Sequence, residues 1–176
     1  MITRCALVAT CVLAGCGGGY RRPPTGPVPL QVEFYNRERI RVASAILAEA
    51  SNGVQISIRA FGLPPDTHGF HIHLAGICEP PDFASAGPHF NPGDKQHGAN
   101  NPAGKHAGDL PNLVVGADSG AVVTVVAEGA TLRPAGTNSL VRKGGTSLVI
   151  HAAPDDEMTD PSGNSGPRIA CAVIAP

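Results

Sequence analysis

The sequence predicts an all-β sandwich or barrel, and two observations support this. The 176 residues include 22 Gly and 17 Pro but no Trp and only five Phe, a composition typical of a chain with many turns and little helix. Short segments rich in Val and Ile lie between the turn-forming stretches, as the strands of an antiparallel fold would. The net charge of −1 gives no indication of nucleic-acid binding or of a polybasic membrane surface.

The amino-terminal residues are expected to lie outside the fold. A short basic start and the apolar run CALVATCVLAG resemble a signal peptide and are too short to span a membrane. The run ends in LAGC, which resembles a bacterial lipobox and implies cleavage before Cys16 and attachment of lipid to its sulfur. An ordinary secretory signal with an unrelated cysteine is the alternative. We expect a signal peptide at 1–15, a flexible Gly/Pro-rich tether at 16–29 and one domain at 30–176. The lipid would hold this domain on the periplasmic side or the cell surface of a bacterium.

The domain is predicted to contain eight strands and two long loops. The first three strands are the segments QVEFYN, VASAILAEA and VQISIRAF, and the second and third are joined by a hairpin turn at 51–53. The segment 77–112 has no strand or helix periodicity, and a loop of this length in a compact domain indicates a functional role. A second polar loop follows at 154–167. The predicted strands are 31–36, 42–50, 54–61, 69–76, 112–117, 121–130, 146–153 and 168–176.

Two histidines of the fourth predicted strand share one face. Residues i and i+2 of a strand point the same way, so His71 and His73 point together while Phe70 and Ile72 face the core. Two imidazoles on one strand face make half of a planar nitrogen site of the kind that copper favours. Taken alone the pair is weak evidence, because such pairs also occur on solvated strands. His151 ends another predicted strand just before the second loop, which strengthens the interpretation.

The first long loop holds a second set of metal-ligand residues. Three imidazoles and one carboxylate, the last two spaced as H-x-x-D, fit a closed tetrahedral zinc site. These residues are His89, His97, His106 and Asp109.

The cysteines indicate a disulfide. If Cys5 and Cys11 leave with the signal peptide and Cys16 carries lipid, only Cys78 and Cys171 remain. In an exported chain such a pair is expected to be oxidised, and two buried thiols are the alternative.

Six segments resemble, in order, the motifs of copper/zinc superoxide dismutases. The resemblance extends from about Val42 to Ile174 and implies an eight-stranded Greek-key β-barrel, a flattened relative of the immunoglobulin-type sandwich. It also implies dismutation of superoxide to O2 and H2O2 by a redox-cycling copper that a histidine bridges to a structural zinc, with one copper and one zinc per chain. The segments are GFHIHLAGIC, SAGPHFNP, KQHG, KHAGDLPNL, LVIHAAPDD and GNSGPRIACAVIAP.

The resemblance also implies a role for each site residue. His89 would be the bridge, which binds both metals and takes up a proton when the copper is reduced. Arg168 would guide the anion, and Asp155 would link a copper-ligand histidine to a zinc-ligand histidine, although the neighbouring Asp156 is an alternative. His68 would be a hydrogen-bonded structural residue that faces away from the metals. The implied copper ligands are His71, His73, His89 and His151; the zinc ligands are His89, His97, His106 and Asp109; the disulfide is Cys78–Cys171.

Some features depart from the family pattern. Pro88 directly precedes the bridge position and Pro167 precedes Arg168, and both are expected to alter the approach of the following side chain slightly. The second loop is acidic and has no lysine, so guidance of the anion must come from Arg168 or from elsewhere. These departures affect the expected rate and not the expected chemistry.

The sequence also bears on two other functions. A barrel that sequesters or delivers copper or zinc without turnover would be expected to lack a copper ligand or the arginine, and this sequence lacks neither. A copper-only dismutase is disfavoured because all the zinc-ligand positions are present. The motifs do not fix the oligomeric state, and a homodimer is compatible with them.

Overall fold

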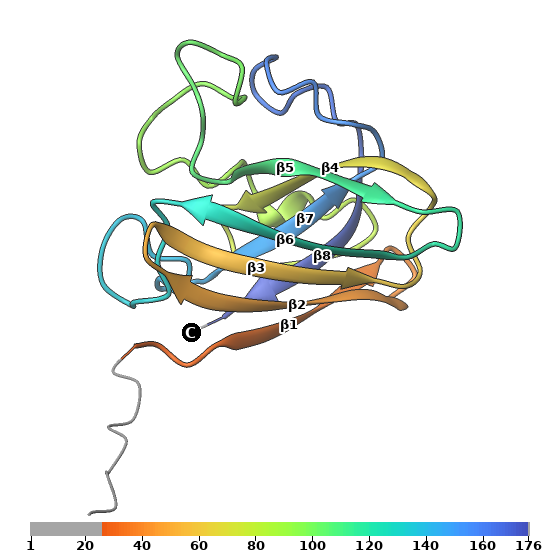
Figure 1. The fold of residues 1–176 in the computed structure, drawn as a ribbon, viewed down its shortest axis with the longest axis horizontal. Helices are drawn as coiled ribbons and strands as arrows, with labels where there is room; N and C mark the ends of the chain where they lie inside the picture. Colours follow the sequence, from red (N-terminus) through yellow and green to blue (C-terminus); the bar gives the residue numbers. More distant parts are fainter. Residues whose placement is uncertain (1–25, 176) are drawn as a thin grey trace, which may run out of the picture.

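The computed structural model describes residues 26–175, and it is all-β as predicted (Figure 1). The predicted signal peptide, Cys16 and most of the tether lie outside the described residues. Within 26–175 no helix is long and apolar enough to cross a membrane. The elements are β1 (Leu30–Asn36), β2 (Arg41–Ala50), β3 (Gly53–Ala60), β4 (Asp66–His73), the short 3-10 helix η1 (Ala84–Ala86), β5 (Asp109–Val115), β6 (Ala121–Glu128), β7 (Thr146–His151) and β8 (Arg168–Ile174).

The eight strands form one antiparallel sheet in the order β5-β4-β7-β8-β1-β2-β3-β6. The sheet curls so that its two edge strands, β5 and β6, lie next to each other without a hydrogen-bonded ladder, which gives a nearly closed barrel (Figure 1). The pairs β4–β7, β8–β1 and β3–β6 join strands that are not consecutive in the sequence, as Greek-key crossovers require. The predicted fold class is confirmed.

Alternating side chains place the core inside the barrel. In β3, Val54, Ile56 and Ile58 are buried, whereas Gln55 and Arg59 are exposed. This alternation is typical of a sheet with one solvated face. In β7 every residue is buried, because its outer face is covered as well. The candidate site lies on this covered outer face of the sheet.

The fourth and fifth strands each begin three residues earlier than predicted. β4 starts at Asp66 because Asp66 and Thr67 pair with Val115 and Val114 of β5. The register shifts between His68 and Phe70, so the strand is not continuous at this point. β5 starts at Asp109, which pairs with His71. Because β4 also ends earlier, at His73, the long loop runs from 74 to 108 and has nearly the predicted length.

A disulfide ties the long loop to the last strand. Cys78 and Cys171 are bonded, with their Cα atoms 5.7 Å apart, as predicted. Phe83 and Ala86 of the same loop pack on Val149 and Cys171 and form a small second apolar cluster. The bond and the cluster together hold the loop against the outer face of β7 and β8.

Candidate metal centre

Three of the candidate histidines lie on the covered outer face of the sheet. His71 and His73 come from β4, where they pair with Val149 and Ser147 of β7. His151 ends β7 on the same face. All three are buried. Phe70 and Ile72, which alternate with His71 and His73 along β4, face the barrel core. The strand alternation expected from the sequence therefore holds from Phe70 to His73.

His89 is held against the end of β4 by its neighbours in the chain. It forms an isolated bridge with His73, in which Leu74 N donates to Pro88 O and Phe90 N donates to Ile72 O, at 2.9 and 2.8 Å. The Phe90 side chain is fully buried in the main core. Pro88 thus offers only its carbonyl to this contact, and the missing N–H of proline costs no hydrogen bond there.

Hydrogen bonds fix which nitrogen of each strand histidine is free. His73 Nδ1 donates to Gly87 O at 2.8 Å, and His151 Nδ1 donates to Gly166 O at 3.0 Å. The Nε2 atoms of His73 and His151 lie 3.4 Å apart. Because each ring donates through Nδ1, each Nε2 has a lone pair that points into the space between the rings. His71 is turned the other way, with Nε2 on Asp155 and Nδ1 facing that space.

The first group has the donor set of a copper site. It consists of His71, His73, His89 and His151, whose ligand atoms all lie within 4.8 Å of one another. His71 Nδ1 and His89 Nε2 are buried and have no hydrogen-bond partner in residues 26–175. Buried polar atoms are almost always paired, so these two atoms point to a cation between the rings. Four imidazole nitrogens suit copper.

The second group converges on one carboxylate oxygen. Nδ1 of His89, His97 and His106 lies 2.9, 3.0 and 3.1 Å from Asp109 Oδ1. At His97 Nδ1 the distance is short but the angle is unsuitable for a hydrogen bond, and the atom is otherwise unpaired. Three nitrogens and one oxygen at these separations fit the ligands of a small tetrahedral ion, and the donor set is that of zinc.

Two residues belong to both metal groups or connect them. His89 is a member of each group, with Nε2 facing the first and Nδ1 facing the second. The Asp155 carboxylate lies between the groups: Oδ2 is 2.7 Å from His71 Nε2, and Oδ1 is 2.9 Å from His97 Nε2. Asp156 is exposed and accepts hydrogen bonds only from its own loop. Of the two neighbouring acids, Asp155 is therefore the one that contacts the histidines.

Sequence reasoning gave no role to two residues that hold Asp155 in place. Asn112 on β5 clamps its backbone: Asn112 Nδ2 donates to Asp155 O and Asp155 N donates to Asn112 Oδ1, both at 2.8 Å. Gly163 has a φ of +61°, and a Cβ there would lie only 1.7 Å from Asp155 Oδ1 and 2.7 Å from His97 Nε2. Only glycine allows the second loop to approach this closely. The one available signal was a glycine in the motif GNSG.

The electrostatics of the first group keep its imidazoles neutral. Burial lowers the pKa of His73 to about 2, and it lowers the pKa values of His89 and His151 to about 4. Burial also lowers the pKa of His71, against the opposing hydrogen bond with Asp155. Neutral imidazoles are the form that binds metal, so this group needs little proton release to accept a cation.

The second group is electrostatically different because it contains carboxylates. Burial disfavours protonation of His97, but the adjacent carboxylates of Asp109 and Asp155 outweigh it and raise the pKa of His97 to about 9. Burial would raise the pKa of Asp109, but hydrogen bonds from His106 and His89 and the close His97 imidazole hold it well below its usual range. Without metal the group therefore holds a proton that a cation would displace.

Arg168 lies at the edge of the first group. Its Nη1 donates to Phe83 O and its Nη2 to Gly87 O, the latter at 2.7 Å. Gly87, at a φ of +73°, turns this same carbonyl to His73 Nδ1. Partial burial lowers the pKa of Arg168 while Asp82 opposes the shift, and an arginine remains charged at neutral pH. Pro167 accepts a hydrogen bond from Ala152 N at its carbonyl, which keeps this end of β8 paired.

His68 lies outside both groups. Its Nδ1 is 2.7 Å from His151 O and its Nε2 is 2.9 Å from Pro64 O. The ring therefore joins the start of β4 to the end of β7 and offers no free nitrogen to a metal.

The comparisons with known proteins agree with this geometry. Residues 42–174 match the family model described as copper/zinc superoxide dismutase. The chain is 48% identical over 143 residues to "Superoxide dismutase [Cu-Zn] 2" of Aquifex aeolicus, covering 81% of this chain and 84% of that protein. A crystal structure of a SOD-like protein from Bacillus subtilis matches with a TM-score of 0.78 and 43% identity, over 81% of this chain and 96% of that one. The Cu/Zn superoxide dismutase from Brucella abortus matches with a TM-score of 0.66 and 29% identity, over 84% and 99%.

Proposed function

This chain belongs to the copper/zinc superoxide dismutase family, and from this premise we propose how its residues carry out the dismutation of superoxide. Superoxide is the substrate, and copper and zinc are the cofactors. When bound, copper supplies the redox couple that converts superoxide to O2 and H2O2, and zinc supplies a redox-inert charge. The observation that carries the proposal is the pair of histidine groups that share His89 and contain buried, unpaired ring nitrogens.

We propose that His71, His73, His89 and His151 hold copper and that His89, His97, His106 and Asp109 hold zinc. His89 would then offer Nε2 to copper and Nδ1 to zinc. A bridging imidazole must lose both ring protons, which two flanking cations make favourable near neutral pH. Nε2 of His89 faces the first group and would be the ring atom that takes up and holds a proton there whenever it is not bound to copper. Asp155 keeps His71 and His97 in fixed orientations by bonding their outer nitrogens.

Arg168 is proposed to bind the incoming anion. Its guanidinium is held beside the first group by two carbonyls, one of which is shared with His73. A planar guanidinium offers several donors and a permanent positive charge to a small anion. The positive charge also raises the encounter rate with an anionic substrate.

The substitution Arg168→Gln tests this role. It is expected to lower kcat/KM by at least about tenfold, since a hydrogen bond to a charged group contributes roughly 1.5–3 kcal/mol and about 1.4 kcal/mol corresponds to tenfold. The rate should also become less sensitive to ionic strength, while copper and zinc content stay unchanged. An unchanged kcat/KM at full copper occupancy would exclude Arg168 as the anion-binding residue.

We also propose that the protein is exported and anchored by lipid on Cys16, on the evidence of the LAGC motif and of a disulfide that requires an oxidising compartment. In a bacterial host, Cys16→Ser should abolish incorporation of labelled fatty acid and release the protein from the membrane fraction. The matched variant Cys11→Ser, within the predicted signal peptide, should still be labelled. Labelling of the Cys16→Ser protein would contradict the proposal.

A further inference from the structure

The turn between β1 and β2 contacts the main chain of Arg168. Arg37, the first residue after β1, is exposed, yet its Nε and Nη2 both donate to the carbonyl oxygen of Arg168, at 3.1 and 3.0 Å. The two arginines are 131 residues apart in the sequence. The contact joins an ordinary surface turn to the residue proposed to bind the anion.

The Arg37 side chain takes the place of a missing backbone donor. The ladder between β1 and β8 ends at the pair Asn36–Ala170, and the Arg168 carbonyl lies two residues beyond it on β8. β1 has turned away at this point, so no further backbone N–H of the strand reaches this oxygen. A guanidinium edge with two parallel donors fixes the direction of a carbonyl as well as its distance. The start of β8 pairs with His151 of β7 on one side and is thus also held on the other side, where β1 has ended.

The turn that presents Arg37 is itself well ordered by hydrogen bonds. Asn36 Oδ1 accepts hydrogen bonds from Glu38 N and Ile40 N, at 3.1 and 2.8 Å. Asn36 O accepts another from Arg39 N at 3.0 Å. Because Asn36 is also paired with Ala170 of β8, the base of the turn is fixed relative to the strand that it supports. Arg37 therefore acts from a defined position.

We propose that Arg37 is a positioning residue for anion binding, and this inference rests on the proposed role of Arg168. Arg168 is held at both ends: Arg37 fixes its carbonyl, and the carbonyls of Phe83 and Gly87 receive its guanidinium. Loss of the outer contact lets the first residue of β8 rotate, which moves the guanidinium relative to the copper group. Arg37 thus tunes the affinity for the anion without touching it.

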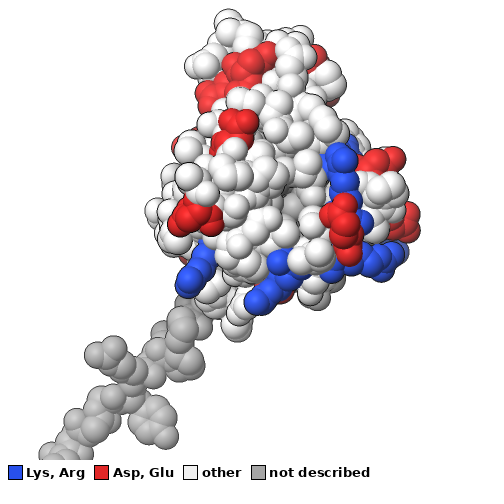
Figure 2. Space-filling view, turned by 90° about the vertical axis from the view of Figure 1, so that its right-hand side faces the viewer, with Lys and Arg blue, Asp and Glu red and all other residues white. Residues whose placement is uncertain are grey.

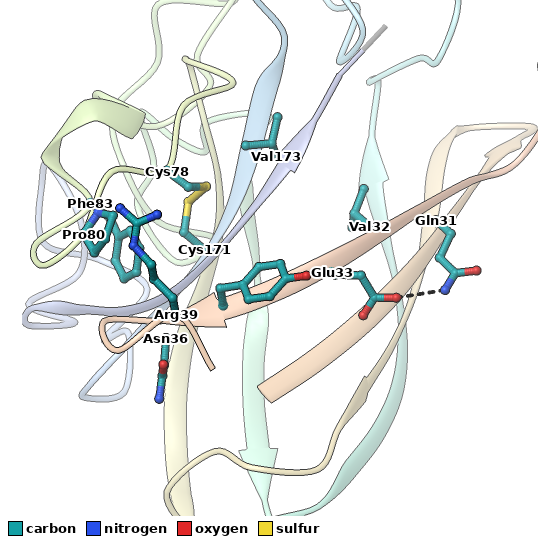
Figure 3. Close-up of a pocket in the computed structure, with 11 residues that line it drawn as sticks. Gln31, Val32, Glu33, Asn36, Arg39, Cys78, Pro80, Phe83, Cys171 and Val173 are labelled. Carbon is teal, nitrogen blue, oxygen red and sulfur yellow. Dashed lines mark hydrogen bonds between the residues drawn. A yellow bond between two sulfur atoms is a disulfide. The ribbon is translucent and has the colours of Figure 1, made fainter. Parts of the chain in front are cut away.

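The charge of Arg37 could alone produce an effect, and Arg39 provides the matched control. Lys and Arg lie mainly in the lower part of the face that includes this turn, with Asp and Glu among them and at the upper end (Figure 2). Arg39 is two residues further along the same turn, exposed and equally charged. Figure 3 shows it reaching toward Pro80 and Phe83, at a groove of about 470 Å³ beside the disulfide. Within residues 26–175 its side chain makes no hydrogen bond or ion pair.

The test compares wild type, Arg37→Gln, Arg39→Gln and Arg37→Lys, all loaded with copper and zinc. Azide, a small linear monoanion, is titrated against the copper absorption band, and kcat/KM for superoxide is measured over a range of ionic strength. Arg37→Gln is expected to weaken azide binding and to lower kcat/KM by about threefold each, as expected for loss of one ordinary hydrogen-bonded contact. Arg39→Gln should leave the azide affinity unchanged. Arg37→Lys keeps the charge but not the two-donor edge, so it should resemble Arg37→Gln.

Three results would overturn the inference. Equal effects of Arg37→Gln and Arg39→Gln, or full recovery in Arg37→Lys, would mean that charge is what matters. A lower melting temperature of Arg37→Gln with unchanged azide affinity would mean that the contact is only structural. These results differ from failure of the proposed function, in which fully copper-loaded wild type would itself not consume superoxide.

Discussion

Replacing His73 by alanine is expected to reduce copper-dependent superoxide consumption by more than about 100-fold while leaving a folded barrel. His73 supplies one of the four nitrogens that point into the space between the rings of the first group, and its Nε2 is free because Nδ1 is bonded to Gly87 O. Loss of an outer hydrogen-bond partner of a ligand already costs about 10–100-fold in metal affinity or activity, so loss of the ligand itself should cost more. The barrel should persist because His73 faces away from the main core.

The measurement is superoxide consumption per chain together with copper and zinc content. Zinc content is the internal control, because His73 is not a member of the second group. The expected result is a protein with normal zinc, little copper and residual activity no greater than that of free copper. A His73→Ala protein that keeps full activity would show that the copper assignment is wrong.

Asp109→Asn is expected to have a comparable effect on zinc. Asp109 Oδ1 lies at the centre of three imidazole nitrogens, and its Oδ2 accepts hydrogen bonds from Gly98 N and His106 N, both at 3.0 Å. The substitution removes both the ligand charge and one acceptor that orders the loop. It also removes a carboxylate that raises the pKa of His97, so the second group loses the charge that compensates a bound cation. Zinc affinity should fall by more than about 100-fold.

This prediction is checked by competition with a zinc chelator, and Asp156→Asn is the matched control. Asp156 is an equally acidic residue of the second loop, but it is exposed and bonds only within that loop. Asp156→Asn should retain the wild-type zinc affinity. Equal zinc affinity of Asp109→Asn and wild type would contradict the assignment of Asp109 to zinc.

The sequence predicted those features that depend on residue type in a short pattern. The Val- and Ile-rich segment 54–61 gave the strand β3, and HxH gave two imidazoles on one face of β4. The disulfide followed from the number of cysteines left in the mature chain and from the oxidising compartment expected for it. The start of β4 was missed because Asp66 follows Pro64 and Pro65, and Pro and Asp are both depleted in strands; Asp66 and Thr67 belong to the strand through their pairing with β5.

The remaining parts of the site depend on contacts that no local pattern encodes. Asn112 hydrogen-bonds the backbone of Asp155, 43 residues away. Gly163 is required because a Cβ at this position would overlap the Asp155 side chain. Arg37 is an arginine in a polar turn, and its partner is a carbonyl group that every residue possesses. Such backbone contacts became visible only in the folded chain.

The most direct test of the central claim is metal analysis and superoxide consumption on the same sample of metal-replete protein. The two ligand sets predict one copper and one zinc per chain and removal of superoxide well above the rate of an equal amount of free copper. Full copper occupancy with no activity above free copper would contradict it.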